Sequence, residues 1–194
     1  MNVSAALILA FLAGITSGCA SPYKFPPPSS SAPVRFAVAD QRPAEERILR
    51  RPEFRIPMDP TEKFGDDQFA SDRISALASY FAEAFSNASP EPGLIVKTFE
   101  LQMYTPKALS SRSGGVAVLS PALAGVLAAQ SEKLDDWMLC FLDGSFDGVP
   151  FHVSVKETFE YRGREPEKVG AIVLQAAFGE AVRQVKAKRS LEGK

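Results

Sequence analysis

Residues 137–161 read WMLCFLDGSFDGVPFHVSVKETFEY, which is two apolar runs joined by Asp147 and Gly148. Asp-Gly between apolar runs predicts a two-residue β-hairpin turn, because both turn positions need a positive φ. Pairing Phe146 with Val149 across this turn sets the register of the two strands. The register then decides which side chains share a face.

The hairpin is predicted to have a core face and an outward face, because side chains alternate between the two faces of a strand. In this register Leu142 lies opposite Val153, and Cys140 lies opposite Val155. The predicted core face comprises Cys140, Leu142, Phe146, Val149, Phe151, Val153 and Val155, and the outward face comprises His152, Ser154 and Lys156.

Two helices are predicted from apolar side chains that recur every three or four residues. The first runs from about residue 71 to residue 86, and Ser71 or Asp67 is expected to cap its start. Its apolar stripe comprises Ile74, Leu77, Ala78, Phe81 and Phe85. The second helix starts near Pro166, a favourable first-turn residue. Its predicted buried side comprises Val169, Ile172, Val173, Ala176, Val182 and Val185.

Two further strands and one long loop complete the predicted domain. Val34, Phe36 and Val38 alternate with other residues and predict a short half-buried strand that ends at Asp40. Residues 94–104 predict another strand. Residues 41–66 contain four prolines, so we expect an irregular loop there.

The predicted order of elements is strand, long loop, helix, strand, apolar insertion, two hairpin strands and helix. The natural packing of this order is an α+β fold, a mostly antiparallel four-stranded sheet with two helices packed on one face. Residues 34–190 are expected to form this single domain. The other face of the sheet is expected to be partly exposed or used by a partner.

Residues 1–18 carry no charged side chain and are almost wholly apolar from Ala5 to Ile15. Small residues follow, which is the layout of a secretory signal peptide. The apolar stretch is too short to span a bilayer comfortably, since a spanning helix needs about 20 apolar residues. The sequence therefore predicts a signal peptide over residues 1–18.

Cys19 stands directly after Ser17 and Gly18, so this segment resembles a bacterial lipoprotein signal. The resemblance implies that Cys19 is acylated, with palmitate among its acyl chains. It also implies that Cys19 becomes the first residue of the mature protein. Ala20 follows in place of the Asp that retains enterobacterial lipoproteins in the inner membrane, which implies an outer-membrane anchor facing the periplasm. The alternatives are an ordinary cleaved signal peptide, with Cys19 there by chance, and an uncleaved anchor.

Residues 19–33 are rich in Pro and Ser and predict a tether that only spaces the domain from the membrane. The formal net charge of −1 argues against nucleic acid as a partner, because binding to phosphates needs a basic excess. If Cys19 is acylated, Cys140 has no disulfide partner, since the chain has two cysteines.

Two segments are candidate contacts for a partner protein or for lipid. Residues 114–130 are uncharged and apolar, with Val116, Val118 and Leu119 as the candidate contacts. An ordinary buried helix over residues 121–130 is the favoured alternative. The five arginines of the long loop, from Arg42 to Arg55, could meet anionic headgroups, with Arg47, Arg50 and Arg51 as the candidate contacts. A solvated loop with local ion pairs is favoured there, because acidic residues are interleaved.

Catalytic, metal and cofactor sites are not predicted. His152 is the sole histidine, and its outward position in the hairpin puts it on the face opposite to Cys140. Catalysis with Cys140 as the nucleophile and His152 as the base would require the two side chains to lie side by side. A lone histidine also lacks the further ligands of a metal site. We therefore expect no enzyme and no small-molecule substrate.

The strand that ends in VADQRP (residues 38–43), after a lipoprotein leader and a proline-rich tether, resembles small Gram-negative lipoproteins of the YajG type. Those proteins begin with a strand that closes in an Asp-x-Arg turn. The order of elements also resembles periplasmic auxiliary lipoproteins of lipid-transport systems. The resemblance implies a non-enzymatic, membrane-anchored accessory with an envelope protein partner. The alternative function is an auxiliary lipoprotein that binds hydrophobic ligands.

Overall fold

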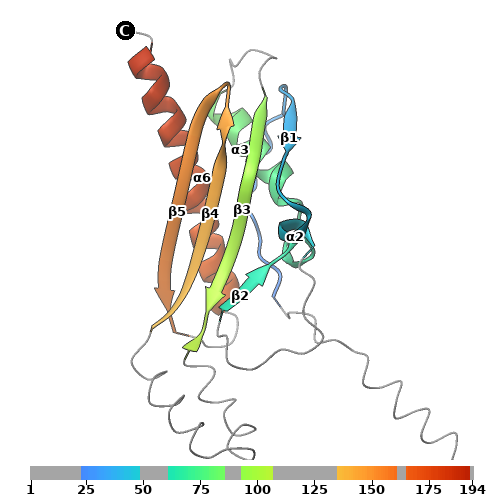
Figure 1. Ribbon diagram of the computed structural model, residues 1–194, viewed down its shortest axis with the longest axis vertical. Helices are drawn as coiled ribbons and strands as arrows, with labels where there is room; N and C mark the ends of the chain where they lie inside the picture. The colour runs from blue at the N-terminus through green and yellow to red at the C-terminus, as the bar shows by residue number, and fades with distance from the viewer. Residues whose placement is uncertain (1–22, 49–60, 86–92, 107–134, 161–164, 193–194) are drawn as a thin grey trace, which may run out of the picture.

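The computed structural model describes residues 23–48, 61–85, 93–106, 135–160 and 165–192. These residues form an α+β fold in which one mixed sheet of five strands carries two long helices on the same face (Figure 1). The predicted fold class is confirmed. The sheet differs from the prediction in having a fifth strand and one parallel pairing.

The predicted hairpin is confirmed in its register. Strand β4 (Asp136–Phe146) pairs antiparallel with β5 (Val149–Phe159), and Phe146 lies opposite Val149. Asp147 and Gly148 have φ of 59° and 73°, as the turn requires. Of the seven side chains predicted to face the core, six are buried and Val155 is half-buried.

Strand β3 (Leu94–Tyr104) is the centre of the sheet. One of its edges pairs antiparallel with β4 over almost its whole length. The other edge is shared by two short strands. β1 (Val38–Asp40) pairs parallel with residues 94–96, and β2 (Thr61–Phe64) pairs antiparallel with residues 101–104. The first strand is therefore shorter than predicted and begins at Val38 rather than Val34.

The segment predicted as an irregular loop over residues 41–66 contains three short elements in its described part. They are helix α2 (Ala44–Arg47), strand β2 and the start of the single 3₁₀ turn η1 (Asp66–Gln68). The helix and the strand among them are each four residues long. A four-residue strand with Glu and Lys in its middle has no apolar pattern, and it forms because it completes the edge of β3.

Helix α3 (Arg73–Ala84) buries four of the five residues of the predicted stripe, with Phe81 fully enclosed. The fifth, Phe85, is half-buried and lies just past the end of the helix. Its cap was predicted wrongly. The Asp72 carboxylate accepts from the Ile74 N–H at 2.9 Å, so Asp72 rather than Ser71 or Asp67 begins the helix. A carboxylate at this position satisfies an N–H that has no partner within the helix.

Helix α6 (Glu165–Glu192) covers β4 and β5 and has Pro166 in its first turn, as predicted. Two predicted core positions are wrong, because Ile172 is 57% exposed and Ala176 is also exposed. The buried stripe comprises Val169, Val173, Leu174, Ala177, Phe178, Ala181, Val182 and Val185. Apolar residues occur on two sides of this helix, and the contact with β4 and β5 decides which side is buried.

The free edge of β5 is partly occupied by side chains of α6. The backbone N–H of His152 donates to Gln184 Oε1 at 3.0 Å, and Gln184 Nε2 donates to the His152 carbonyl at 2.9 Å. Lys188 Nζ donates to the Pro150 carbonyl at 2.6 Å. One amide side chain therefore makes the pair of hydrogen bonds that a neighbouring strand would make.

Residues 23–27 of the predicted tether pack against the folded core, which corrects the expectation for that part, whereas residues 28–33 are exposed or half-buried. Phe25 is fully buried, and its ring lies 4.5 Å from that of Phe64. The Phe25 N–H donates to the Gln68 carbonyl at 2.9 Å, and its carbonyl accepts from the Ala70 N–H at 2.9 Å. Gly170 of α6 makes room for this ring, since an added Cβ would stand 2.4 Å from Phe25 Cδ1.

Aromatic rings fill the space between the sheet and the helices. Phe81 lies 4.9 Å from Phe146, and Phe99 lies 5.7 Å from Phe178. Among the helices in the described ranges, none is both long enough and apolar enough to cross a bilayer.

Candidate functional site

A cluster of charged side chains, three of them buried, lies where β1 and β2 leave the edge of β3 uncovered. We name it the arginine cluster, and it comprises Asp40, Arg42, Glu46, Asp66 and Arg73. Arg42, Glu46 and Arg73 are each less than a tenth exposed. Buried charges are costly unless they are paired and hydrogen-bonded, so the contacts of each member decide its role.

Arg42 joins β1 to the 3₁₀ turn η1. Its Nε donates to Asp40 Oδ1 at 2.9 Å, and its Nη1 donates to Asp66 Oδ1 at 3.0 Å. Nη2 reaches both carboxylates, at 3.0 and 3.2 Å. The Arg42 backbone N–H also donates to Asp40, at 3.1 Å, and closes a tight turn between the two residues.

Arg73 and Glu46 satisfy the backbone of Phe99, which neither β1 nor β2 pairs. The Phe99 N–H donates to Glu46 Oε1 at 2.6 Å, and its carbonyl accepts from Arg73 Nη1 at 2.6 Å. Arg73 also donates to Asp66 at 2.6 Å and lies over the rings of Phe69 and Phe99. The cluster therefore substitutes for the missing stretch of neighbouring strand.

Two opposing effects set the pKa values of the arginine cluster: burial disfavours the charged forms, and pairing with opposite charges favours them. Burial lowers the pKa of Arg73, and the nearby Arg42 charge lowers it further. Burial would lower the pKa of Arg42, but its bonds to Asp40 and Asp66 outweigh burial and raise it. Burial raises the pKa of Glu46, whereas the bonds from Arg42 hold the pKa of Asp40 low despite burial. We assign the cluster a structural role.

Of the residues predicted to contact a partner or lipid, Arg47 is the one that lies within the described residues. Arg47 is 40% exposed and donates to the carbonyls of Asp40 and Arg42 at 2.9 Å each, so it holds the turn after β1. A lipid contact by Arg47 stays a prediction. Cys19, Arg50, Arg51, Val116, Val118 and Leu119 lie outside the described residues. Arg42 was predicted to lie in a solvated loop and is instead buried.

His152 and Cys140 lie on opposite faces of the hairpin, as predicted. The His152 side chain is 76% exposed, and Nδ1 lies 3.4 Å from Asp143 Oδ1. Cys140 is fully buried, and burial raises the pKa of its thiol to about 12. A thiol in that state is a poor nucleophile at neutral pH. No group of His, Cys, Asp and Glu suited to a metal ion occurs in the part of the chain that the structure describes.

The sheet face away from α3 and α6 is a further candidate, and we name it the open face. It comprises Ile95, Glu100, Gln102, Tyr104, Trp137, Leu139, Phe141, Asp143, His152, Ser154 and Lys156. Among the described elements, no long helix covers it (Figure 1). Trp137, Leu139 and Phe141 of β4 form its apolar strip, and the ring of Tyr104 stacks on that of Trp137 with 5.0 Å between the ring centres.

The charges that flank the apolar strip are already engaged with one another. Lys63 of β2 pairs with Glu100 at 3.1 Å, and Asp143 pairs with His152. The Lys156 ammonium lies 4.8 Å from the centre of the Trp137 ring. A surface of this kind is complementary to an apolar partner rather than to a strongly charged one.

The sequence contains one indication that the outer face of β4 is apolar, and the pairing register alone does not reveal it. Residues 137–142 are apolar without interruption, so β4 is apolar on both faces. A strand with one face in water normally alternates with polar residues, whereas a strand buried on both faces reads as a continuous apolar run. The composition of the first half of β4 is therefore typical of a strand that is covered on both faces.

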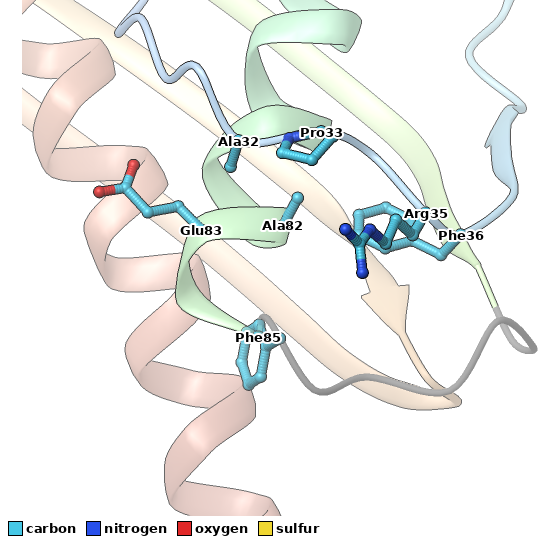
Figure 2. Close-up of a pocket in the computed structure, with 7 residues that line it drawn as sticks. All are labelled: Ala32, Pro33, Arg35, Phe36, Ala82, Glu83 and Phe85. Carbon is cyan, nitrogen blue, oxygen red and sulfur yellow. The ribbon is translucent and has the colours of Figure 1, made fainter.

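Two surface pockets lie at the margins of the domain. The larger, of about 350 Å³, lies between the N-terminal segment and the last turn of α3. Figure 2 shows Arg35 and Phe36 on one side of it and Phe85 on another, with Ala82 between them. The smaller, of about 210 Å³, lies beside α2 and is lined by Pro43, Glu46 and Phe64 among others.

Comparison of the chain with protein-family models, with curated proteins and with solved structures finds no match.

Proposed function

We propose that the chain is a lipid-anchored lipoprotein of the outer membrane, facing the periplasm, that acts as a non-enzymatic accessory. Its open face docks an envelope protein through the apolar strip. The observation that carries the proposal is the continuous apolar run of β4, whose outer side chains Trp137, Leu139 and Phe141 have no helix over them among the described elements. The anchor rests on Cys19 and the leader before it.

The partner's chemistry follows from the paired charges of the open face. Lys63 and Glu100 already form an ion pair, and Asp143 Oδ1 already lies 3.4 Å from His152 Nδ1, so a partner gains little by adding charge there. Burial of Trp137, Leu139 and Phe141 would supply the binding energy, since aromatic anchors dominate interfaces of this kind. We therefore expect a protein segment rich in apolar side chains.

The anchor is tested by Cys19→Ser. We expect the wild-type protein to carry acyl mass and to fractionate with the outer membrane, and the variant to lose the acyl mass and leave that fraction. The reason is that two or more acyl chains give stable anchoring. Intact mass and membrane fractionation measure both effects, with Cys140→Ser as the matched control. A soluble, unacylated wild-type protein would contradict the anchor.

The docking face is tested by photo-crosslinking in cells. A photoreactive residue at Phe141 is expected to give a discrete adduct with one envelope protein, and the same residue at Ile172, on the exposed side of α6, is expected to give none. Leu139→Asp should abolish the adduct, because a charge in the centre of an apolar contact costs binding energy. Equal adducts at both positions, or persistence in Leu139→Asp, would refute docking on this face.

The alternative function, an auxiliary lipoprotein of a lipid-transport system, rests on the larger pocket. Its lining includes Phe36 and Phe85, which suit an acyl chain, and the charged side chains Arg35 and Glu83, which suit a polar headgroup. It lies at the end of α3 rather than between sheet and helices, where aromatic rings occupy the space. Lipid that copurifies in stoichiometric amount with the protein would favour this alternative.

A further inference from the structure

The folded core begins very close to the proposed lipid anchor. Tyr23 and Phe25 are buried in the core, at 9% and 0% exposure. Only Ala20, Ser21 and Pro22 stand between Cys19 and Tyr23. Four Cα–Cα steps of about 3.8 Å span at most about 15 Å. A tether of 15 residues, which the sequence predicts, would allow much more freedom than this.

The point where the chain leaves the core lies at one end of the molecule. The Lys24 N–H donates to Glu167 Oε1 at 3.1 Å, in the first turn of α6, and the Lys24 ammonium bonds the Asp67 carbonyl of η1. The opposite end of α6 contacts the hairpin turn through Arg189 and Asp147. Figure 1 shows the C-terminal end of α6 and the β4–β5 turn far from the start of α6.

We infer that residues 20–22, which we name the short leash, hold the domain upright, with the axis of α6 directed away from the lipid surface. The inference rests on the proposed acylation of Cys19. The end formed by η1 and the first turn of α6 then lies against the headgroups, and the hairpin turn points away. A helix of 28 residues is about 42 Å long, so the domain ends within about 60 Å of the bilayer.

The surface chemistry of the α6 side agrees with an upright position. It carries Lys168, Gln175 and Arg183, and its exposed large apolar side chains, Ile172 and Leu191, are 19 residues apart and form no continuous stripe. The formal net charge of −1 offers no general attraction to an anionic surface. The open face then stands beside the membrane rather than on it, so a docking partner must itself come close to the same membrane.

The orientation is tested by energy transfer from the protein to the lipid surface. The acylated protein, purified from membranes, is labelled at Lys168→Cys or at Ala187→Cys and placed in phosphatidylethanolamine–phosphatidylglycerol vesicles with a headgroup-attached acceptor. Both positions are exposed on α6. Cys140 stays unlabelled because it is fully buried and its thiol pKa is about 12, and Cys19 is blocked by its lipid.

Transfer from position 168 is expected to exceed transfer from position 187 by about fivefold or more, because the two lie about 28 Å apart along the helix axis. A Gly-Ser insertion of about 20 residues between Pro22 and Tyr23, with an r.m.s. span of about 25 Å, should remove most of this difference. The same insertion after Lys194 is the control and should preserve it.

The outcomes separate this inference from the function on which it rests. Equal transfer from both positions in an acylated protein would overturn the upright orientation and leave the anchor standing. A difference that survives the insertion after Pro22 would overturn the role of the short leash. A protein without acyl mass would refute the anchor, and the inference with it.

Discussion

Phe25→Ala is expected to lower the free energy of unfolding by about 3–5 kcal/mol, the usual cost of removing a large buried aromatic ring. Phe25 is fully buried against Phe64, Phe69 and Gly170, so its loss leaves a cavity that the surrounding backbone cannot close. Urea unfolding of a chain that starts at residue 19 and carries Cys19→Ser measures the effect without lipid.

Val34→Ala is the matched control for this prediction. Val34 belongs to the same N-terminal segment but is 39% exposed. Its replacement is expected to change the free energy of unfolding by about 0.5 kcal/mol or less. If Phe25→Ala proved equally mild, the N-terminal segment would be the loose spacer that its prolines and serines suggest, and the short leash would be lost.

Arg73→Met is expected to destabilise the same chain by about 3–5 kcal/mol, because Arg73 is buried and its loss leaves the buried Glu46 carboxylate and the Phe99 carbonyl with less positive charge beside them. The Phe99 carbonyl loses its donor, and Asp66 loses a bond of 2.6 Å. Glu46 then keeps its bond to the Phe99 N–H with less positive charge nearby. Urea unfolding followed by circular dichroism measures the loss.

Arg183→Met provides the comparison for Arg73→Met. Arg183 also pairs with a carboxylate at 2.6 Å, that of Glu180, but its side chain is 70% exposed. We expect no measurable change in the urea midpoint, since exposed pairs contribute little to stability. A midpoint for Arg73→Met that matched that of Arg183→Met would show that the arginine cluster does not support the edge of β3.

The sequence predicted the elements whose signals are local. Asp147-Gly148 fixes a turn type and, through it, the pairing of β4 with β5. The apolar stripe through Leu77 and Phe81 locates α3 for the same reason. Strand β2 was missed because its four residues have no apolar pattern and form a strand only through β3, which lies about 40 residues further along the chain.

The N-terminal segment and the arginine cluster were missed because their causes are not local. Pro26 to Pro28 are typical of a linker, and nothing in their neighbourhood indicates that Gly170 leaves space for Phe25. Arg42 was predicted to be ion-paired, which it is, but its burial depends on a gap in the edge of β3. Of the predicted contact residues, Arg47 alone lies within the described residues.

The amide of Gln184 has a consequence for how this protein behaves among copies of itself. An unpaired strand at a sheet edge is a template on which another chain can add, and such addition leads to aggregation. Gln184 occupies both backbone groups of His152, Lys188 occupies the Pro150 carbonyl, and Pro150 has no N–H to offer. The first half of the β5 edge is thus closed to strand addition. Molecules at high local concentration therefore stay separate at this edge, although each has aromatic side chains on its open face.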